Sequence, residues 1–144
     1  MIVFFNEDID FNVLKPRLTK AWLKSVAVAE GFSVNQLNYI FCSDQYLLAM
    51  NQQYLAHDYF TDIITFDNSD ENSTAIHGDI FVSIERIVDN SKTLDAEFAS
   101  EFLRVIVHGV LHLCGYDDTT EVLKSEIRAK EDFYIKLYNS TKNS

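Results

Sequence analysis

A run of apolar residues in the C-terminal third of the chain constrains the fold more strongly than any other feature. Residues 96–114 have the length and spacing of one helix, and its second half, residues 103–113, is apolar on almost every side. A helix without a polar face has to be covered by other elements. The sequence therefore predicts that this helix lies in the centre of the core.

The rest of the chain supplies strands and helices that can cover it. Strands are predicted at residues 2–5, 37–42, 63–66 and 76–84, and residues 67–74, rich in Asp, Asn and Ser, predict a hairpin-like loop. Further helices are predicted at residues 12–30, capped by Asn12 and stopped by Gly31, at residues 43–57, capped by Ser43, and at residues 85–90. A last helix follows Thr119 or Thr120, and we expect the polar tail, residues 139–144, to fray.

The order of these elements is β-α-β-α-β-β-α-α-α. Such an order predicts a single α/β domain over residues 1–144. In it, helices pack against a small mixed sheet of about four strands, which we expect to be centred on the apolar helix.

The composition narrows the class of protein. Of the 144 residues, 47% are hydrophobic and one is proline, which predicts a globular core rather than disorder. We find no apolar run that could span a bilayer, no signal peptide and no glycine-rich nucleotide-binding loop. Cys42 and Cys114 form no CxxC pair, so we interpret both as reduced thiols of a cytoplasmic protein. We therefore expect neither a membrane partner nor a nucleotide cofactor.

The net charge of −10, from 22 acidic and 12 basic residues, argues against a protein that binds nucleic acid non-specifically. Phosphate binding draws on clustered Lys and Arg side chains. Any nucleic-acid role must therefore depend on a local basic surface, a bound cation or a partner that does the docking.

Two histidines interrupt the apolar helix. His108 and His112 are four residues apart, so both imidazoles lie on one face of the helix and can reach one point. Burying them without partners would cost on the order of 1–3 kcal/mol each, a cost that a metal ion would offset. Hydrogen-bonded core histidines are the alternative. Gly115 can end the helix and turn the chain, so that Asp118 approaches the same point. We therefore predict a divalent metal site of His108, His112 and Asp118 with one open coordination position.

Two neighbouring residues refine this prediction. Asp117 is the competing third ligand, although we interpret it as a cap of the last helix. Zinc proteases commonly carry Glu directly after the first His as general base, and here that position is Gly109. Because the helix offers no such base, peptide hydrolysis loses support.

Three segments together resemble the YbeY-type endoribonuclease family. Residues 108–118 match its signature H-G-x-L-H-L-x-G-Y-D-H at every defined position except the last. Residues 51–66 resemble its segment N-x-x-[YF]-R-x-K-D followed by P-T-D-V-L-S-F-P, and residues 78–80 match its G-D-I motif. The resemblance implies a small α/β metalloprotein that holds zinc at the signature and cleaves single-stranded RNA. It further implies roles in maturing small-subunit ribosomal RNA and in ribosome quality control, with ribosomal RNA and the ribosome or its assembly factors as partners.

Three departures from the family pattern bear on the site. Asp118 stands where the family has its third His ligand, and Leu55 and His57 stand where it has arginine and lysine. A carboxylate also binds zinc, so the metal role can carry over. His57 is interpreted either as a titratable donor near the cleft or as a surface residue at a helix end.

Three functions stay open at this point. The leading hypothesis is a metal-dependent endoribonuclease. The alternatives are a zinc metalloprotease and a non-catalytic ribosome-assembly factor in which the metal is structural. The residues do not indicate which side chains act as general acid or base.

Overall fold

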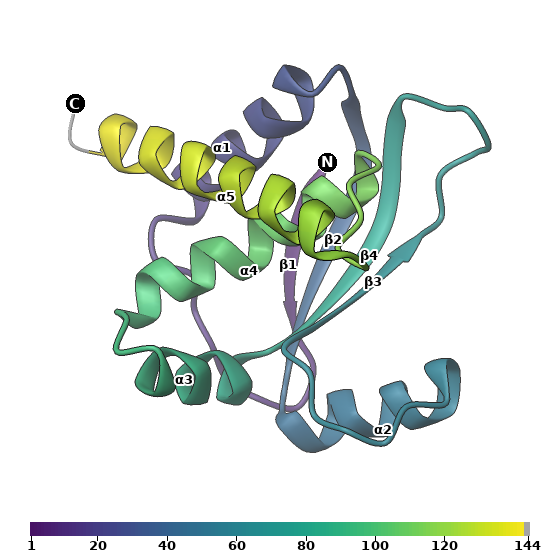
Figure 1. Ribbon diagram of the computed structural model, residues 1–144, viewed down its shortest axis with the longest axis vertical. Coiled ribbons are helices and arrows are strands. Elements are labelled where there is room, and N and C mark those ends of the chain that lie inside the picture. The colour runs from purple at the N-terminus through teal and green to yellow at the C-terminus, as the bar shows by residue number, and fades with distance from the viewer. Residues whose placement is uncertain (143–144) are drawn as a thin grey trace.

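Four strands form one mixed sheet in the order β1-β2-β4-β3 (Figure 1). In this computed structural model, which describes residues 1–142, the parallel strands are β1 (Ile2–Asn6), β2 (Ser33–Cys42) and β4 (Ala75–Ser83). β3 (Ile63–Asp67) runs antiparallel to β4 at one edge. The predicted mixed sheet is confirmed.

Five helices complete the described part of the chain: α1 (Pro16–Ala29), α2 (Asp44–Leu55), α3 (Ile84–Thr93), α4 (Phe98–Leu113) and α5 (Glu121–Lys142). Serine side chains start two of them, as the sequence predicts for α2. Ser43 Oγ accepts a hydrogen bond from the Tyr46 amide, and Ser83 Oγ accepts one from the Arg86 amide. The element order is the one predicted, and the α/β fold class is confirmed.

The helix α4 lies between the sheet and α5, in the middle of the main core (Figure 1). Its buried Ile106 and Val110 belong to the same apolar cluster as Leu37 and Ile80 of the sheet. α1 packs on the same face of the sheet, and α5 crosses over α4 and α1 on the side away from the strands. This arrangement explains why residues 103–113 need no polar face.

The opposite face of the sheet is covered by α2. Leu47 of α2 packs with Cys42 and Ile64 in a second, smaller core cluster. Both cysteines are free thiols, as predicted, and Cys42 is fully buried here. Among the described residues, no helix combines the length and apolar character needed to cross a membrane.

Gly109 allows α4 to lie directly on the sheet. A Cβ atom at this position would lie 2.7 Å from Ile80 Cδ1 and 3.1 Å from Ile63 Cδ1. Both distances are shorter than ordinary van der Waals contact. The position faces the strands, so glycine is needed there for packing.

Two predicted boundaries are wrong by four residues. α1 begins at Pro16 rather than Asn12, because Lys15 adopts a left-handed conformation (φ 52°) just before it. β2 begins at Ser33, four residues before the predicted start, since its polar first half pairs with β4 at Ala75 and Ile76.

The predicted fraying of residues 139–144 is wrong up to Lys142, where α5 ends, and residues 143–144 lie outside the described part. Tyr138 stabilises these last turns, because its ring packs edge-on against Trp22 with centroids 5.1 Å apart. The Trp22 indole also donates to the Tyr134 carbonyl oxygen at 2.8 Å.

Candidate metal centre

The two helical histidines and Asp118 converge on one point at the C-terminal end of α4. The Nε2 atoms of His108 and His112 lie 2.8 Å apart. Asp118 Oδ2 lies 3.4 Å from the first and 3.7 Å from the second. One ligand atom from each residue lies within 4.8 Å of the others, so the cluster could hold a metal ion.

The turn after α4 brings Asp118 to the histidines. Gly115 adopts φ +101°, a left-handed conformation that favours glycine. The Gly115 amide donates to the His112 carbonyl oxygen and the Tyr116 amide donates to the Leu111 carbonyl oxygen, which closes the helix end. The predicted reversal of the chain at Gly115 is therefore what the structure shows.

The hydrogen bonds of the two Nδ1 atoms assign the tautomers of the histidines. His112 Nδ1 lies 2.8 Å from the Tyr116 carbonyl oxygen, which can only accept, so Nδ1 carries the proton. His108 Nδ1 donates to Glu131 Oε2 at 2.6 Å. In the neutral imidazoles both Nε2 atoms then present lone pairs to each other and to Asp118. Three facing electron-pair donors repel one another unless a cation or a proton lies between them, and this donor set fits a divalent metal ion.

Glu131 of α5 is the buried carboxylate that orients His108. Its side chain is 5% exposed and also accepts a hydrogen bond from Arg104 Nη1 at 2.9 Å. Burial lowers the pKa of His108, but the hydrogen bond and charge of Glu131, together with Asp118 and Asp62, raise it above its usual value. Sequence reasoning missed Glu131. The available signal was an acid four residues after Ile127, on the inward face of the last helix.

Glu30 anchors the turn that holds His112. Its carboxylate accepts hydrogen bonds from the hydroxyls of Tyr116, at 2.8 Å, and Tyr134, and pairs with Lys130. Burial raises the pKa of Glu30, but the two tyrosine hydrogen bonds and the Lys130 charge outweigh it, so the net pKa is lowered. Since the Tyr116 carbonyl receives the His112 hydrogen bond, Glu30 acts on the site through Tyr116. Nothing in the sequence pattern pointed to this contact.

Asp117 does not join the cluster. Its carboxylate accepts from the Asp118 amide at 2.7 Å and from the Thr119 hydroxyl at 3.3 Å, which stabilises the turn locally. The cap of α5 is Thr120, whose hydroxyl oxygen accepts from the Leu123 amide. The interpretation of Asp117 as a helix cap is therefore wrong, and Thr120 is the one of the two threonines that caps.

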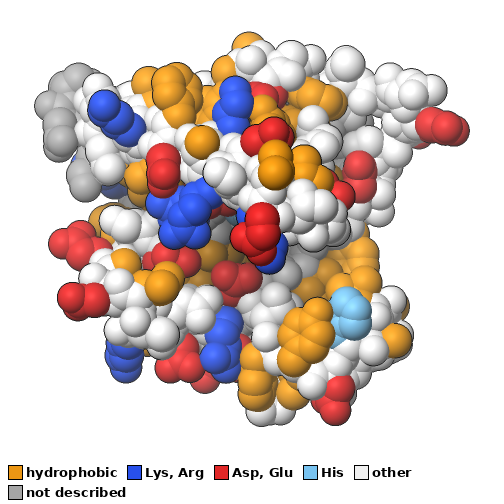
Figure 2. Space-filling model, viewed as in Figure 1, with side chains coloured by type: hydrophobic (Ala, Val, Ile, Leu, Met, Phe, Trp, Pro, Cys, Tyr) orange, Lys and Arg blue, Asp and Glu red, His pale blue; other side chains and the backbone are white. Residues whose placement is uncertain are grey.

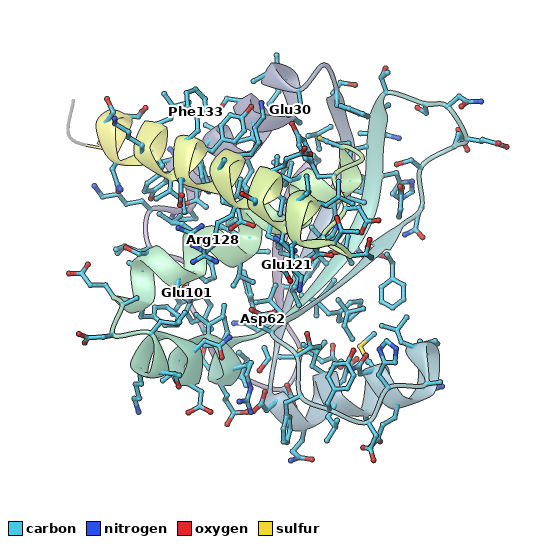
Figure 3. All side chains as sticks on the ribbon, in the orientation of Figure 1. Glu30, Asp62, Glu101, Glu121, Arg128 and Phe133 are labelled. Atoms are coloured by element: carbon cyan, nitrogen blue, oxygen red, sulfur yellow. The ribbon has the colours of Figure 1, made fainter. Side chains whose placement is uncertain are left out.

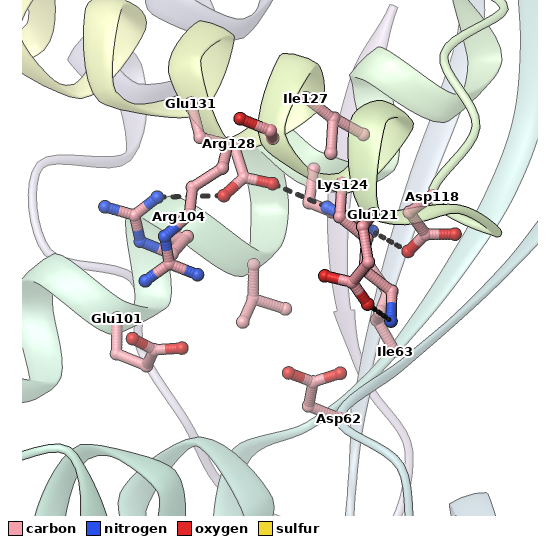
Figure 4. A pocket seen from close by; sticks show the side chains of 13 residues that line it. Asp62, Ile63, Glu101, Arg104, Asp118, Glu121, Lys124, Ile127, Arg128 and Glu131 are labelled. Atoms are coloured by element: carbon pink, nitrogen blue, oxygen red, sulfur yellow. Dashed lines mark hydrogen bonds and ion pairs between the residues drawn. The ribbon is translucent and has the colours of Figure 1, made fainter.

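The cluster lies between two hollows that share Asp62, Ile63, His108 and Asp118. The larger, about 610 Å³, is bounded by α4 and α5 and includes Glu101, Arg104 and Arg128 in its lining (Figure 4). Figure 2 shows the hollow in this face of the molecule, with Lys and Arg side chains gathered along its α5 edge. The second hollow is bounded by β3 and includes Leu55, Thr65 and His112.

Asp62 reaches the space between α3, α4 and α5 from the segment before β3 (Figure 3). Burial raises the pKa of its carboxyl more than the charges of His108 and Arg86 lower it. His57, by contrast, lines neither hollow. Its exposed ring stacks on Tyr59, with centroids 5.1 Å apart, and its Nδ1 bonds to the Tyr59 hydroxyl.

Comparison with known proteins places these features in a family. The model of the family described as Endoribonuclease YbeY matches residues 5–139. The chain belongs to the endoribonuclease YbeY family. A relative named Endoribonuclease YbeY from Cytophaga hutchinsonii is 48% identical over 136 residues, which cover 94% of both chains. Another of that name from Flavobacterium psychrophilum is 44% identical, covering 99% of this chain and 100% of its own.

The fold is similar to that of a solved structure as well. The solution structure of TM1509 from Thermotoga maritima has a TM-score of 0.69 and 26% identity, covering 99% of this chain and 92% of that one. Membership of the endoribonuclease YbeY family confirms the predicted family and the predicted class of enzyme, a nuclease.

Proposed function

We propose that this chain is an endoribonuclease that cuts single-stranded RNA with one zinc ion held by His108, His112 and Asp118. We also propose that residues 1–144 form a single domain. The observation that carries the proposal is the pair of Nε2 atoms 2.8 Å apart, whose Nδ1 atoms are both already hydrogen-bonded. Two imidazoles and a carboxylate are a donor set that suits zinc with a position left open.

In this proposal the protein's own residues prepare the site. Glu131 and the Tyr116 carbonyl oxygen keep the protons on the Nδ1 atoms, so that both Nε2 lone pairs face the ion. A bound divalent ion would supply Lewis acidity toward a phosphate oxygen and lower the pKa of bound water. The Asp118 carboxylate lowers the net positive charge of the metal site. The pKa of bound water would therefore be lowered less than at a site with three neutral ligands.

We further propose Asp62 as the group that moves a proton during cleavage. It lines both hollows together with His108 and Asp118. The pKa of its carboxyl is raised and so lies closer to neutral pH, and proton transfer by a side chain is most effective when its pKa is near the operating pH. In the proposed step an Asp62 carboxylate oxygen accepts the proton of the attacking hydroxyl, whether that of water or of a ribose 2′-hydroxyl, as its oxygen bonds to phosphorus. The bond from phosphorus to the leaving ribose oxygen breaks, and that oxygen takes a proton from solvent.

The proposed substrate in the cell is ribosomal RNA of the small subunit, with the ribosome or its assembly factors as partners. The family to which the chain belongs supports an RNA substrate. This substrate would place the protein in the cytoplasm, where ribosomes are made. Peptide hydrolysis is the less favoured alternative, since residue 109 is glycine and a larger side chain there would meet Ile80 and Ile63.

The test compares Asp118→Ala with Asp117→Ala, a matched loss of a neighbouring carboxylate outside the cluster. The ratio of metal to protein is measured by elemental analysis. Cleavage is measured with a labelled single-stranded RNA and with the duplex of the same RNA. We expect wild type and Asp117→Ala to bind one zinc and to cut the single strand, and Asp118→Ala to lose both properties. Metal-loaded wild type that leaves single-stranded RNA intact, with and without ribosomes, would contradict the proposal. Normal ribosomal RNA maturation in cells carrying metal-free Asp118→Ala would instead favour a non-catalytic assembly factor.

A further inference from the structure

The two hollows beside the metal cluster differ in charge. The hollow on the β3 side includes the carboxylates Asp62, Asp67 and Asp118 in its lining, and none of its described lining residues is Lys or Arg. The hollow on the α5 side has five carboxylates and three cationic side chains, the latter being Arg104, Lys124 and Arg128. Of these two hollows, the one on the α5 side is therefore the one whose described lining residues include Lys and Arg side chains to meet an RNA phosphate.

Two of the three cations are already engaged by carboxylates. Arg104 uses both ends of its guanidinium, Nη1 with Glu131 at 2.9 Å and Nη2 with Asp132 at 2.6 Å. Lys124 Nζ lies 3.5 Å from Glu121 Oε1, one turn away on the same helix. Arg104 therefore supports the carboxylate that orients His108, and its charge is neutralised by its partners.

Arg128 is different. Its exposed side chain extends from α5 into the hollow (Figure 4), and within residues 1–142 it has no hydrogen bond or ion pair, although its charge opposes the rise that burial causes in the pKa of Glu101. It lies on α5 three residues before Glu131, and so one helical turn from the residue that contacts His108. A guanidinium offers a planar fork of N–H donors that matches two phosphate oxygens.

We infer that Arg128 is a phosphate-binding cation of the hollow on the α5 side and holds the RNA backbone at the end of that hollow away from Asp118 (Figure 4). The inference rests on the proposed function and adds a positioning residue to it. It assigns one contact by which a chain with a net charge of −10 can bind an RNA phosphate. Together with a bound divalent ion, Arg128 would offset part of the negative charge of the five carboxylates in this hollow, where an RNA phosphate would otherwise be repelled.

The experiment measures kcat and KM of the zinc-loaded enzyme on a labelled single-stranded RNA over a series of salt concentrations. Arg128→Ala is compared with wild type and with Lys136→Ala, which removes one positive charge from an exposed position of α5 outside the hollow. We expect Arg128→Ala to raise KM on the order of tenfold with kcat little changed, because the lost contact is made equally before and during cleavage. The plot of log(1/KM) against log[salt] should become less steep by about 0.7, the value for one phosphate contact on a single strand.

Three results would overturn the inference. The first is a KM and salt slope for Arg128→Ala equal to those of wild type. The second is an equal change in Lys136→Ala, which would mean that only the net charge matters. The third is a loss of bound zinc from Arg128→Ala, which would assign Arg128 a structural role. If wild type itself fails to cut RNA, the proposed function fails instead, so the two failures are distinguishable.

Discussion

Replacing Glu131 with glutamine tests whether the buried carboxylate of α5 sets the metal affinity of the site. The Glu131 side chain is 5% exposed and lies between two donors, His108 Nδ1 at 2.6 Å and Arg104 Nη1 at 2.9 Å. Glutamine has the same shape but only one accepting oxygen. If that oxygen accepts from His108, the amide NH2 group faces the Arg104 guanidinium, which is also a donor, and the hydrogen bond to Arg104 is lost. If it faces Arg104, the amide forces the His108 proton onto Nε2, where it blocks the lone pair.

We expect either orientation to lower the affinity of the site for zinc. Loss of a carboxylate that orients a metal-binding histidine typically lowers metal affinity by roughly 10–100-fold. This corresponds to about 1.4–2.8 kcal/mol of binding free energy. The affinity is measured by competition with a coloured chelator, and the stabilisation of the folded state by zinc is measured by thermal unfolding with and without the ion.

Asp132→Asn is the matched control for Glu131→Gln. Asp132 also pairs with Arg104, at 2.6 Å, but its side chain is 60% exposed and it makes no contact with His108. We expect the zinc affinity of Asp132→Asn to stay within about a factor of two of wild type, since exposed ion pairs contribute little to stability. A Glu131→Gln protein that folds normally and binds zinc as tightly as Asp132→Asn would refute the argument from histidine orientation.

Three further predictions concern residues around the site. Asp62→Asn should lower kcat by roughly 10²–10⁴-fold with zinc content unchanged, and cleavage at wild-type rate would contradict its role in proton transfer. Glu30→Gln should lower the free energy of unfolding by about 1 kcal/mol at neutral pH. Because the pKa of Glu30 is lowered from its ordinary value of 4.5 on folding, the stability that its charge contributes is present above that value and is lost as pH falls through the lower folded-state pKa. Chemical denaturation from neutral to acidic pH checks this, and a difference from wild type that persists in acid would be inconsistent with it. Gly109→Glu should create no protease and should destabilise the fold by about 4 kcal/mol or more, since the side chain would meet Ile80 and Ile63; a stable protein by circular dichroism would argue against that packing.

Local pattern was sufficient for much of the fold and for half of the site. The apolar run at residues 103–113 predicted a central helix, and α4 lies there. The spacing of His108 and His112 predicted that their rings would meet. The glycine at position 115 predicted the turn that brings Asp118 to them, and Gly115 does adopt a positive φ there. Each of these features depends on residues within about one or two helical turns, so neighbouring residues alone determine it.

The surroundings of the site were decided by tertiary structure. Glu131 contacts His108 across 23 residues, and Glu30 contacts Tyr116 across 86. No periodicity relates such distant positions, and each carboxylate taken alone resembles an ordinary surface acid. The same limit explains the missed start of β2, whose polar residues become a strand only because β4 pairs with them. The sequence by itself thus determined which side chains could bind a metal, because helical spacing is local. Only the packing of α5 and α1 against α4 decided which groups orient those side chains, because that depends on contacts between distant segments.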